Sequence, residues 1–546
     1  MRRFLASVTL VALCNITLLP VAALGQANNS LPEQAVEHRA EVSRPVHFDT
    51  TTRPLREMFP TKDAPPARAG RDFRSGSPQA HGDTNPSGND PLVEKSGGTL
   101  SAFAQPRAAT IGTEVDPNAR VAPPDTTGDV GPNHYVQWVN LRYSIYTLTR
   151  DANGISGFNL VAGFPKQGNV VWQGFGGPCQ NFNDGDPIVQ YDQLADRWVL
   201  TQFAVSSTPY TQCVAVSTGP DPTGTYHRYS FSYNKDFNDY PKMGVWPNGY
   251  YITYNMFRNG RSYVGNRVCA FERDRMLLGQ SARQVCAQTG TSQFSLVPAD
   301  LEGSTLPPAN APNYLLSITS TALNFWRFAV NWTTGTGTLT GPITVPGVAA
   351  FSRACGGGTC IPQPGTTRTL DSLGDRLMYR LAYRNLGTRE ALVINHSVAT
   401  GGSSGVRWYE LSNAVGQTLA SANPVVRQQG TFAPDASWRW MGSAAIDKTG
   451  GIAVGYNISN STTIKPSIRY AYRGPLDPLG AMGNETDILA GPGVQTGTLA
   501  RWGDYSTLSV DPVDGCTMVF TTQYQPANGS FNWTTYISSF KLSTCL

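Results

Sequence analysis

The sequence is poor in histidine, in helical signals and in the motifs of several enzyme classes. Its 546 residues include only 6 His. It contains no CxxC pair of a zinc site, no HExxH motif of a zinc protease and no P-loop of a nucleotide-binding enzyme. Convincing amphipathic helices are scarce, and the best candidate, over 273–278, is short. These absences favour an all-β protein and give no support to metalloprotease or nucleotide-dependent functions.

Nucleic acid and membrane are poorly supported as partners. Charged residues make up 15% of the chain, the formal net charge is only +4, and no stripe of basic residues is present. Proteins that bind nucleic acid usually carry such a stripe. After the N-terminal segment, no run approaches the roughly 18 consecutive apolar residues of a membrane span. We therefore expect a monomer with no nucleic-acid partner and no membrane span.

The N-terminus has the pattern of a secretory signal. Arg2 and Arg3 precede an apolar run over 4–24, which ends among small residues such as Gly25. This order of charge, apolar segment and cleavage site is typical of a signal peptide, here over 1–27. A membrane anchor is the alternative, but Pro20 goes against it. The sequence thus predicts a secreted protein, either extracellular or periplasmic.

Residues 28–108 have the composition of a disordered leader. They are rich in Pro, Gly, Ser, Asn and charge, as in KDAPPARAGRDFRSGSPQAHGDTNPSGND, and their apolar residues follow no strand or helix period. Such a segment cannot bury enough apolar surface to offset its ordering entropy. We expect a linker, a propeptide or a cell-envelope spacer before a folded part over 109–546.

Eight cysteines remain after the signal segment, which contains Cys14. An even number in an exported chain predicts disulfides. The sequence does not determine the connectivity, but the spacing favours pairs of neighbours: Cys179–Cys213, Cys269–Cys286, Cys355–Cys360 and Cys516–Cys545. The last pair would tie the end of the chain to its final strands.

Internal self-similarity is the main signal from residue 123 onward. Segments such as PPDTTGDVGPNHYVQWVN, DYPKMGVWPNGYYITYNM and DYSTLSVDPVDGCTMVFTTQY contain an anchor residue, a short apolar strand, a turn and a second alternating strand. This order is typical of a β-hairpin. Seven anchors recur at intervals of 53 to 71 residues: Asp125, Asp186, Asp239, Asp300, Asp371, Trp440 and Asp504.

These intervals suit one four-stranded antiparallel sheet with long loops. Between the second and third anchors, strands are predicted over 187–192, 197–203, 213–217 and 226–232. Such sheets repeated around an axis form a β-propeller, so seven anchors predict seven blades. Only three strands fit after Asp504, and a strand near 108–115 is expected to complete the last blade and cover its open edge. A β-sandwich array or a solenoid is the alternative.

The phrases DSLGDRLMYRLAYRN, SWRWMGSAAIDKTGGIAVGYN, PSIRY and RWGDYSTLSVDPVDGCTMVF resemble a family of secreted bacterial β-propeller proteins without an assigned function. The resemblance runs from about Pro123 to Cys545 and implies no catalytic residue. DPTGTYHRY and DPVDGCTMVF are loosely similar to the Asp-boxes of sialidase-type propellers. The regular Ser-x-Asp-x-Gly-x-x-Trp form is missing, so this second resemblance implies the fold more than an activity.

The Asp anchors are the first candidate site, because the innermost strand of each propeller blade lines the central channel. Asp125, Asp186, Asp239 and Asp504 are candidate catalytic residues. Crowded carboxylates repel one another, so that one serves as a protonated acid and another as base or nucleophile on a glycan. The structural alternative is that each anchor caps backbone N–H groups of a neighbouring loop. Asp184 and Asp186 are alternatively a Ca²⁺ site, since hard oxygen ligands suit that ion.

Residues that break the repeat are the second candidate site. Trp440 replaces Asp next to Arg439, and an aromatic ring with a guanidinium suits sugar stacking and carboxylate binding. Arg376, Arg469 and Arg501 are expected to join them, in a manner similar to the arginine cluster with which sialidases hold an acidic sugar. The alternatives are packing at blade edges and pairing with the Asp ring.

These features favour an exported carbohydrate-active propeller, a glycosidase or lyase that acts on an acidic polysaccharide or cell-surface glycan. The rival is a non-catalytic glycan-binding or adhesion propeller, because a fold does not imply an activity. The geometry of the carboxylates distinguishes the two. Carboxyls in an open pocket at the separations of known glycosidases favour hydrolysis, whereas carboxylates all hydrogen-bonded to neighbouring blades favour binding.

Overall fold

A computed structural model describes residues 35–59, 90–94, 106–483 and 485–545 of the chain. The predicted signal peptide lies outside these residues. Within them the regular structure is almost entirely β, which confirms the all-β prediction, and no helix is long and apolar enough to cross a membrane. The helical elements are single turns: α1 (Gly177–Asn181), α2 (Arg273–Leu277), η1 (Leu55–Glu57), η3 (Gly168–Trp172) and η4 (Ala354–Gly357).

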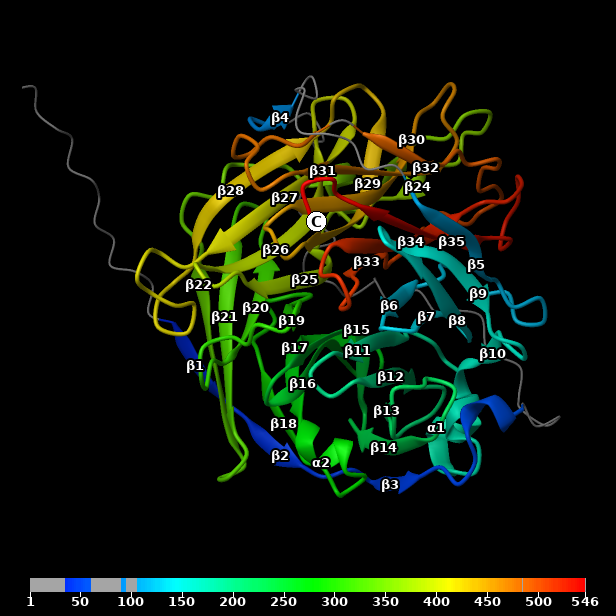
Figure 1. Ribbon diagram of the computed structural model, residues 1–546, viewed down its shortest axis with the longest axis vertical. Helices are drawn as coiled ribbons and strands as arrows, with labels where there is room; N and C mark the ends of the chain where they lie inside the picture. The colour runs from blue at the N-terminus through cyan, green and yellow to red at the C-terminus, as the bar shows by residue number, and fades with distance from the viewer. Residues whose placement is uncertain (1–34, 60–89, 95–105, 484, 546) are drawn as a thin grey trace, which may run out of the picture. The chain divides into compact units, whose positions relative to one another are not determined.

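The first three sheets are each formed by strands that follow one another in sequence (Figure 1). The first contains β6 (Thr127–Val130), β7 (His134–Val139), β8 (Arg142–Asp151), β9 (Gly154–Leu160) and β10 (Lys166–Gln167). The second contains β11 (Ile188–Asp192), β12 (Arg197–Ala204), β13 (Thr211–Ser217) and β14 (Tyr226–Ser232), which confirms the four strands predicted there. The third contains β15 (Asp236–Trp246), β16 (Gly249–Arg258), β17 (Ser262–Phe271) and β18 (Gln284–Gln288).

The next two groups of four strands are joined into one larger sheet. They are β19 (Val297–Leu301), β20 (Asn313–Ile318), β21 (Leu323–Asn331) and β22 (Thr336–Thr344), then β25 (Met378–Asn385), β26 (Glu390–Ala399), β27 (Ser404–Ser412) and β28 (Val425–Phe432). The parallel pairing of β19 with β25 connects the two groups. A two-stranded sheet, β23 (Thr359–Ile361) and β24 (Leu370–Asp371), lies between them in sequence.

The last two sheets use the C-terminal strands. One contains β29 (Trp438–Ile446), β30 (Ile452–Ser459), β31 (Ser467–Arg473) and β32 (Thr486–Leu489). The other contains β33 (Thr507–Val510), β34 (Thr517–Tyr524), β35 (Thr534–Lys541) and an N-terminal strand, β5 (Ala108–Glu114). β5 pairs antiparallel with β35, so the prediction that a strand near 108–115 completes the last sheet is confirmed.

The first strands of successive sheets lie beside one another. β6 lies beside β11, β11 beside β15, β15 beside β19, β19 beside β25, β25 beside β29, and β29 beside β33. β33 in turn lies beside β6, as Figure 1 also shows. Every sheet is therefore covered by neighbours, which explains why strands such as β13 and β16 are buried along nearly their whole length. Strands covered on both faces need no strict alternation of apolar and polar residues.

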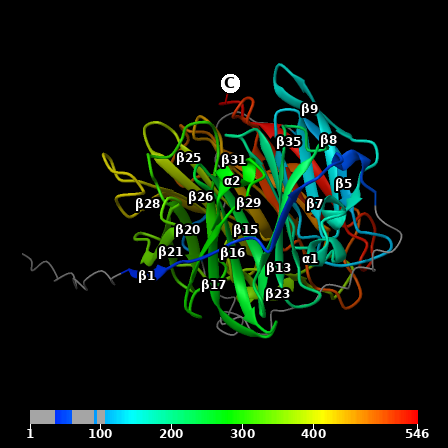
Figure 2. The same ribbon diagram turned by 90° about the horizontal axis from the view of Figure 1, so that it is seen from below.

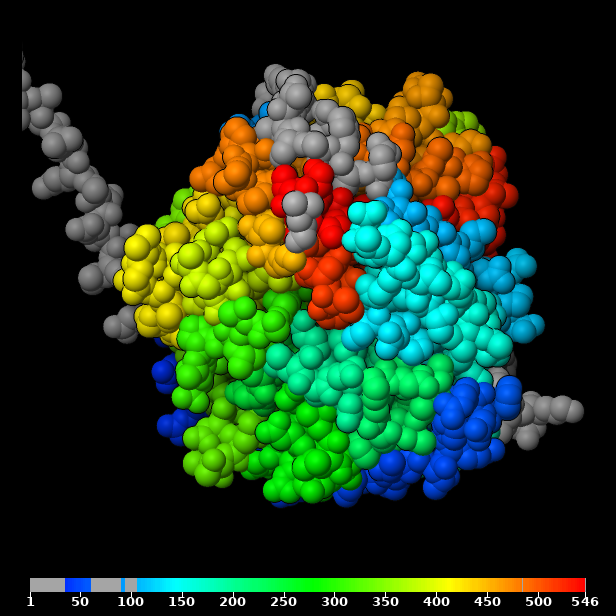
Figure 3. Space-filling model, viewed as in Figure 1, coloured from blue at the N-terminus to red at the C-terminus, as the bar shows by residue number. Residues whose placement is uncertain are grey.

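The prediction of a disordered leader over 28–108 is wrong for residues 35–59. Here β1 (Val36–Arg39), β2 (Glu41–Ser43) and β3 (His47–Thr50) pair with the outer strands β22, β18 and β14 of three sheets. Figure 2 shows this blue segment crossing in front of the green strands, and Figure 3 shows its atoms against green and cyan ones. The composition argument fails because the segment needs no core of its own: open sheet edges supply its backbone partners.

A short piece of the leader is also held by a buried ion pair. β4 (Val93–Glu94) pairs in parallel with β28. Just before it, both carboxylate oxygens of Asp90 accept hydrogen bonds from Arg407 Nη2 at 2.5 Å, and Oδ2 also accepts one from the Thr431 hydroxyl. Neither side chain of the Asp90–Arg407 pair is exposed. Residues 60–89 and 95–105 of the predicted leader lie outside the described residues.

All four predicted disulfides are present: Cys179–Cys213, Cys269–Cys286, Cys355–Cys360 and Cys516–Cys545. The second links adjacent strands, since Cys269 of β17 is paired directly with Cys286 of β18. The fourth joins the start of β34 to the end of the chain, as expected from the sequence.

Replacement of Asp90 by Ala should lower the free energy of unfolding by about 3–5 kcal/mol, because Arg407 would remain buried without its carboxylate. Chemical denaturation of the full chain measures this loss. Asp49→Ala is the matched control: its carboxylate also binds an arginine, Arg228, but is 29% exposed. A loss for Asp90→Ala no larger than that of the control would contradict this role of the leader.

Candidate functional site

Three of the Asp anchors lie at a recurring bend of the backbone. Asp125, Asp186 and Asp504 have φ values of 50°, 45° and 57°, in the left-handed region, two or three residues before β6, β11 and β33. Asp tolerates this conformation better than most residues because its short polar side chain bonds locally. The bend turns the chain into the first strand of each sheet, and it places these three carboxyl groups around one cavity.

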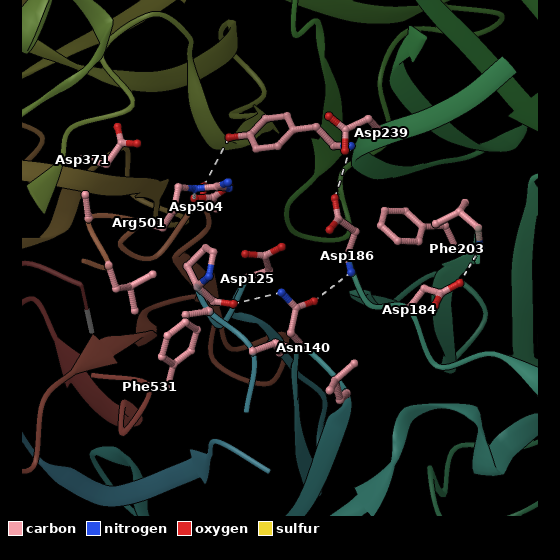
Figure 4. Close-up of a pocket in the computed structure, with 18 of the residues that line it drawn as sticks. Asp125, Asn140, Asp184, Asp186, Phe203, Asp239, Asp371, Arg501, Asp504 and Phe531 are labelled. Carbon is pink, nitrogen blue, oxygen red and sulfur yellow. Dashed lines mark hydrogen bonds and ion pairs between the residues drawn. The ribbon is translucent and has the colours of Figure 1, made fainter. Parts of the chain in front are cut away.

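The cavity has a volume of about 580 Å³. Its wall includes four residues that the sequence predicted as catalytic, two predicted arginines and three phenylalanines: Asp125, Asp186, Asp239, Asp504, Arg376, Arg501, Phe203, Phe237 and Phe531. Figure 4 shows the aspartates converging on it from several sheets. Asp184, predicted as a metal ligand, also lines the cavity, so the structure brings together seven of the predicted site residues, while their chemical roles remain a prediction.

Asn140 connects two of the aspartate bends and was missed by the sequence reasoning. Its side-chain oxygen accepts a hydrogen bond from the backbone N–H of Asp186 at 2.9 Å, and its amide donates to the carbonyl of Pro123 at 3.0 Å (Figure 4). It therefore fixes the bends at Asp125 and Asp186 relative to each other. Its place in the turn between β7 and β8 is the only sequence signal, and it does not distinguish this Asn from an ordinary turn residue.

The pKa values of Asp125 and Asp186 are both raised, and the hydrogen bond between the two carboxyls acts on them in opposite directions. Burial, followed by repulsion from Asp186 and Asp504, raises the pKa of Asp125 well above its ordinary value. Burial also raises the pKa of Asp186, but a hydrogen bond with Asp125, the charge of Lys242 and a hydrogen bond with Tyr505 act in the opposite direction. The hydrogen bond between the two carboxyls raises one pKa and lowers the other, as expected when Asp125 holds the shared proton.

Hydrogen bonds and two aromatic rings surround Asp186. Asp186 Oδ2 accepts hydrogen bonds from the Tyr505 hydroxyl at 2.9 Å and from the backbone N–H of Tyr240 at 3.2 Å. Beneath them, Lys242 Nζ lies 3.4 Å and 3.3 Å from the ring centroids of Tyr240 and Tyr505. Burial lowers the pKa of Lys242 well below its ordinary value, whereas Asp186 and Asp125 raise it. A cation here would be stabilised by the two aromatic faces.

Asp239 is the third acid with a shifted pKa. Its pKa is raised to about 7, first by burial and then by Asp186, while Arg376 and Arg501 lower it. Asp239 is partly exposed to the cavity. At this bend the left-handed residue is the next one, Tyr240. At the other two bends, Asp125 and Asp186 are themselves left-handed.

The two arginines of the cavity are already ion-paired. Arg501 Nε donates to Asp504 Oδ1 at 3.2 Å. Arg376 binds its neighbour Asp375 with two hydrogen bonds, at 2.8 Å and 2.9 Å, and its guanidinium lies 4.5 Å from the ring centroid of Tyr240. An incoming carboxylate would therefore compete with carboxylates of the protein for both guanidinium groups.

The other two Asp anchors are not equivalent to the first group. Asp371 lines the cavity, and its Oδ1 accepts a hydrogen bond from the backbone N–H of Leu373 at 3.1 Å. Asp300 lies inside β19, where it accepts a hydrogen bond from the N–H of Val245 and binds the buried Arg380. The prediction that Asp300 is an anchor is wrong, because the left-handed residue before β19 is Ser295.

The predicted calcium role of Asp184 and Asp186 is not supported. Asp184 Oδ2 accepts the backbone N–H groups of Val205 and Ser206 at 2.5 Å and 2.7 Å, and Oδ1 accepts the Ser206 hydroxyl at 2.6 Å. This is the loop cap that was the structural alternative. In the described part of the chain, no group of three or more His, Cys, Asp or Glu residues is arranged to hold a metal ion.

The prediction that Trp440 and Arg439 form a sugar-binding face is wrong, since both side chains are fully buried. Trp440 packs against Trp502, with ring centroids 5.9 Å apart. Arg439 binds Glu485 at 2.7 Å and 3.0 Å, and Arg469 binds the same carboxylate at 2.6 Å. None of the three lines the cavity. They support the β29–β32 sheet.

No protein-family model matches the sequence, and no curated protein is significantly similar to it. Among solved structures, the chain is similar to an α-L-arabinofuranosidase from Fusarium graminearum, with 10% identity over 80% of this chain and 99% of that one and a TM-score of 0.36. It is also similar to an exo-β-1,3-galactanase from Clostridium thermocellum, with 11% identity over 70% and 81% and a TM-score of 0.27. A core factor from S. cerevisiae aligns with 8% identity over 82% and 63% and a TM-score of 0.34. Because these scores are low, we infer the function of this chain from its own residues.

Trp440→Ala should reduce the free energy of unfolding by about 3–5 kcal/mol, the usual cost of truncating a buried Trp. Denaturation curves measure this, and ligand binding by the fraction that still folds should be unchanged. Normal stability of Trp440→Ala together with weaker glycan binding would instead support the sugar-binding role that the sequence predicted for Trp440.

Asp239→Asn should change how stability depends on pH. The pKa of Asp239 is about 7 in the folded state and about 3.9 when unfolded. A raised carboxyl pKa stabilises the fold at low pH, and this contribution is lost as the pH rises from about 4 through about 7. Urea denaturation at several pH values should therefore show equal stability near pH 4 and a more stable variant at pH 8. A difference in stability between Asp239→Asn and the unmodified protein that does not vary with pH would contradict the raised pKa of Asp239.

Proposed function

We propose that the described chain forms a seven-bladed β-propeller. The support is the series of contacts among the first strands of seven four-stranded groups, in which β33 lies beside both β29 and β6. The pairing of β5 with β35 completes the last blade with a strand from the N-terminal side. Closure in this way removes the open edge that a linear array would leave.

We further propose that the protein is exported and acts as a monomer. Four disulfides support an oxidising compartment, because such bonds persist outside the reducing cytosol. The secretory signal over 1–27 remains a prediction from the sequence.

We infer that the cavity is the active site of a glycoside hydrolase. The observation that carries this inference is the pair Asp125 and Asp186, which line one open cavity with opposite expected charge states. Hydrolysis of a glycosidic bond needs one protonated carboxyl and one ionised carboxylate on either side of the scissile bond. Phe531, which is partly exposed in the wall, supplies a face on which a sugar ring can stack.

The proposed mechanism assigns a role to each partner. The entering glycan must first separate the two hydrogen-bonded carboxyls, because glycosidase carboxyls lie about 5 Å or more apart. Asp125 then gives its proton to the leaving glycosidic oxygen, while Asp186 either takes a proton from the attacking water or attacks the anomeric carbon. In the second case, water activated by the deprotonated Asp125 cleaves the bond between the sugar and Asp186. Tyr505 and the N–H of Tyr240 hold Asp186 in position, and the charge of Lys242 favours its ionised form. A lyase would instead need free cations for a uronic carboxylate, and the ion pairs of Arg376 and Arg501 make this the weaker candidate.

A non-catalytic glycan-binding protein is the second candidate. The hydrogen bonds that Asp186 accepts from Tyr240 and Tyr505 favour it, because they are the contacts of a carboxylate that connects neighbouring blades. In that case the cavity would bind a glycan without cleaving it.

Incubation with a panel of neutral, acidic and amine-bearing polysaccharides tests the proposal. We expect new reducing ends from at least one polymer. Asp125→Asn and Asp186→Asn should each lower the rate about 10²–10⁴-fold with little change in melting temperature. Asp274→Asn, on an 84% exposed side chain of α2, is the matched control. Binding without product would favour the second candidate, and full activity in both site variants would show that the reaction occurs elsewhere.

A further inference from the structure

The charge of the cavity wall suggests which sugars it accepts. Six of its residues are acidic and two are basic: Asp125, Asp184, Asp186, Asp239, Asp371 and Asp504 against Arg376 and Arg501. The same imbalance contributes to the raised pKa of Asp125 and of Asp239: burial is the largest cause, and repulsion from Asp186 and Asp504 adds to it. The wall therefore disfavours an anionic ligand and favours a cationic one.

The arginines do not reverse this preference. The carboxylates of Asp504 and Asp375 already bind Arg501 and Arg376. A uronic or sialic acid would have to displace these partners and would also face the remaining aspartates. The acidic substrate expected from the sequence depended on a cluster of four arginines, two of which, Arg439 and Arg469, are bound to Glu485 away from the cavity.

One carboxyl oxygen in the wall has an unused capacity to accept hydrogen bonds. Asp125 is only 4% exposed, and its Oδ1 has no hydrogen-bond partner in the described part of the chain. Figure 4 shows this carboxyl near the middle of the group of lining side chains. A buried polar atom without a partner is costly, so a ligand donor that reaches Oδ1 would gain a strong interaction. An ammonium group is such a donor, and its charge complements the neighbouring carboxylates of Asp186 and Asp504, which act on Asp125.

A metal ion fits this wall less well than an organic cation does. Ca²⁺ needs six to eight oxygen ligands at close range, and the described residues include no cluster of three acidic, His or Cys side chains able to hold an ion. The aspartates instead surround a cavity of about 580 Å³, large enough for a sugar unit. The partly exposed Phe531 in the same wall favours a ligand with an apolar ring face.

We propose that the cavity binds the protonated amine of an amino sugar, so that the preferred glycan carries free amino groups rather than acetamido or carboxylate groups. This inference rests on the proposed glycan-directed function and specifies its substrate class. An ammonium beside Asp125 would also lower the pKa of this carboxyl toward the working pH. A general acid whose pKa lies near the working pH donates its proton more readily.

The test compares three hexasaccharides of equal length by calorimetry with the full chain: one of β-1,4-linked glucosamine, one of N-acetylglucosamine and one of galacturonic acid. At a pH that keeps the amines protonated, the glucosamine hexamer should bind about 10–100-fold more tightly than the acetylated one, as expected for a charge-assisted hydrogen bond. The galacturonic hexamer should bind least. Added salt should weaken the preferred complex, because it screens charges.

Asp371→Asn removes a carboxylate from the wall but keeps the side-chain oxygen that accepts the backbone N–H of Leu373, and it should reduce the preference for the amine. Asp274→Asn should leave the preference unchanged. Equal or tighter binding of the acetylated or galacturonic hexamer would overturn the amine proposal while leaving a glycan-directed function in place. Failure of all three to bind would also overturn it, and the polysaccharide panel would then decide separately whether the protein acts on glycans.

Discussion

Repulsion among buried carboxyl groups is the constraint on which the site depends. Burial and neighbouring charges both disfavour ionisation, so the aspartates around the cavity cannot all be charged at once. The structure offsets part of this cost with Lys242 beneath Asp186 and with Arg501 beside Asp504. These groups come from β15 and from the bends before β11 and β33. The charge pattern therefore exists only when several sheets are assembled, and the fold and the chemistry are coupled.

The N-terminal strands also depend on the assembly of several sheets, because they pair with strands far away in sequence. The outer edge of a sheet has unpaired backbone groups, which are a liability in a β protein. The chain covers three such edges with β1, β2 and β3 and completes another sheet with β5. Its N-terminal segment thus acts as additional strands on sheets formed by residues far away in sequence.

Much of the strand content could be predicted because hairpins are local. Turn residues and alternation placed β11–β14 nearly correctly, and cysteine spacing predicted all four disulfides. The leader could not be predicted, because its strands depend on edges elsewhere in the chain. Trp440 was misassigned because its burial depends on distant parts of the chain. Its ring packs against Trp502 in a cluster that includes Leu370 and Met441, and the local sequence does not reveal these neighbours.

The central claim is that Asp125 keeps a proton that its partner Asp186 has lost. The carboxyl ¹³C resonance of Asp125, assigned by comparison with Asp125→Asn and followed from acid to alkaline pH, tests it most directly. We expect a midpoint well above the ordinary value of about 3.9, and a lower midpoint in Asp186→Asn, where the neighbouring negative charge is gone. A midpoint near the ordinary value, unchanged in that variant, would contradict the proposed division of roles.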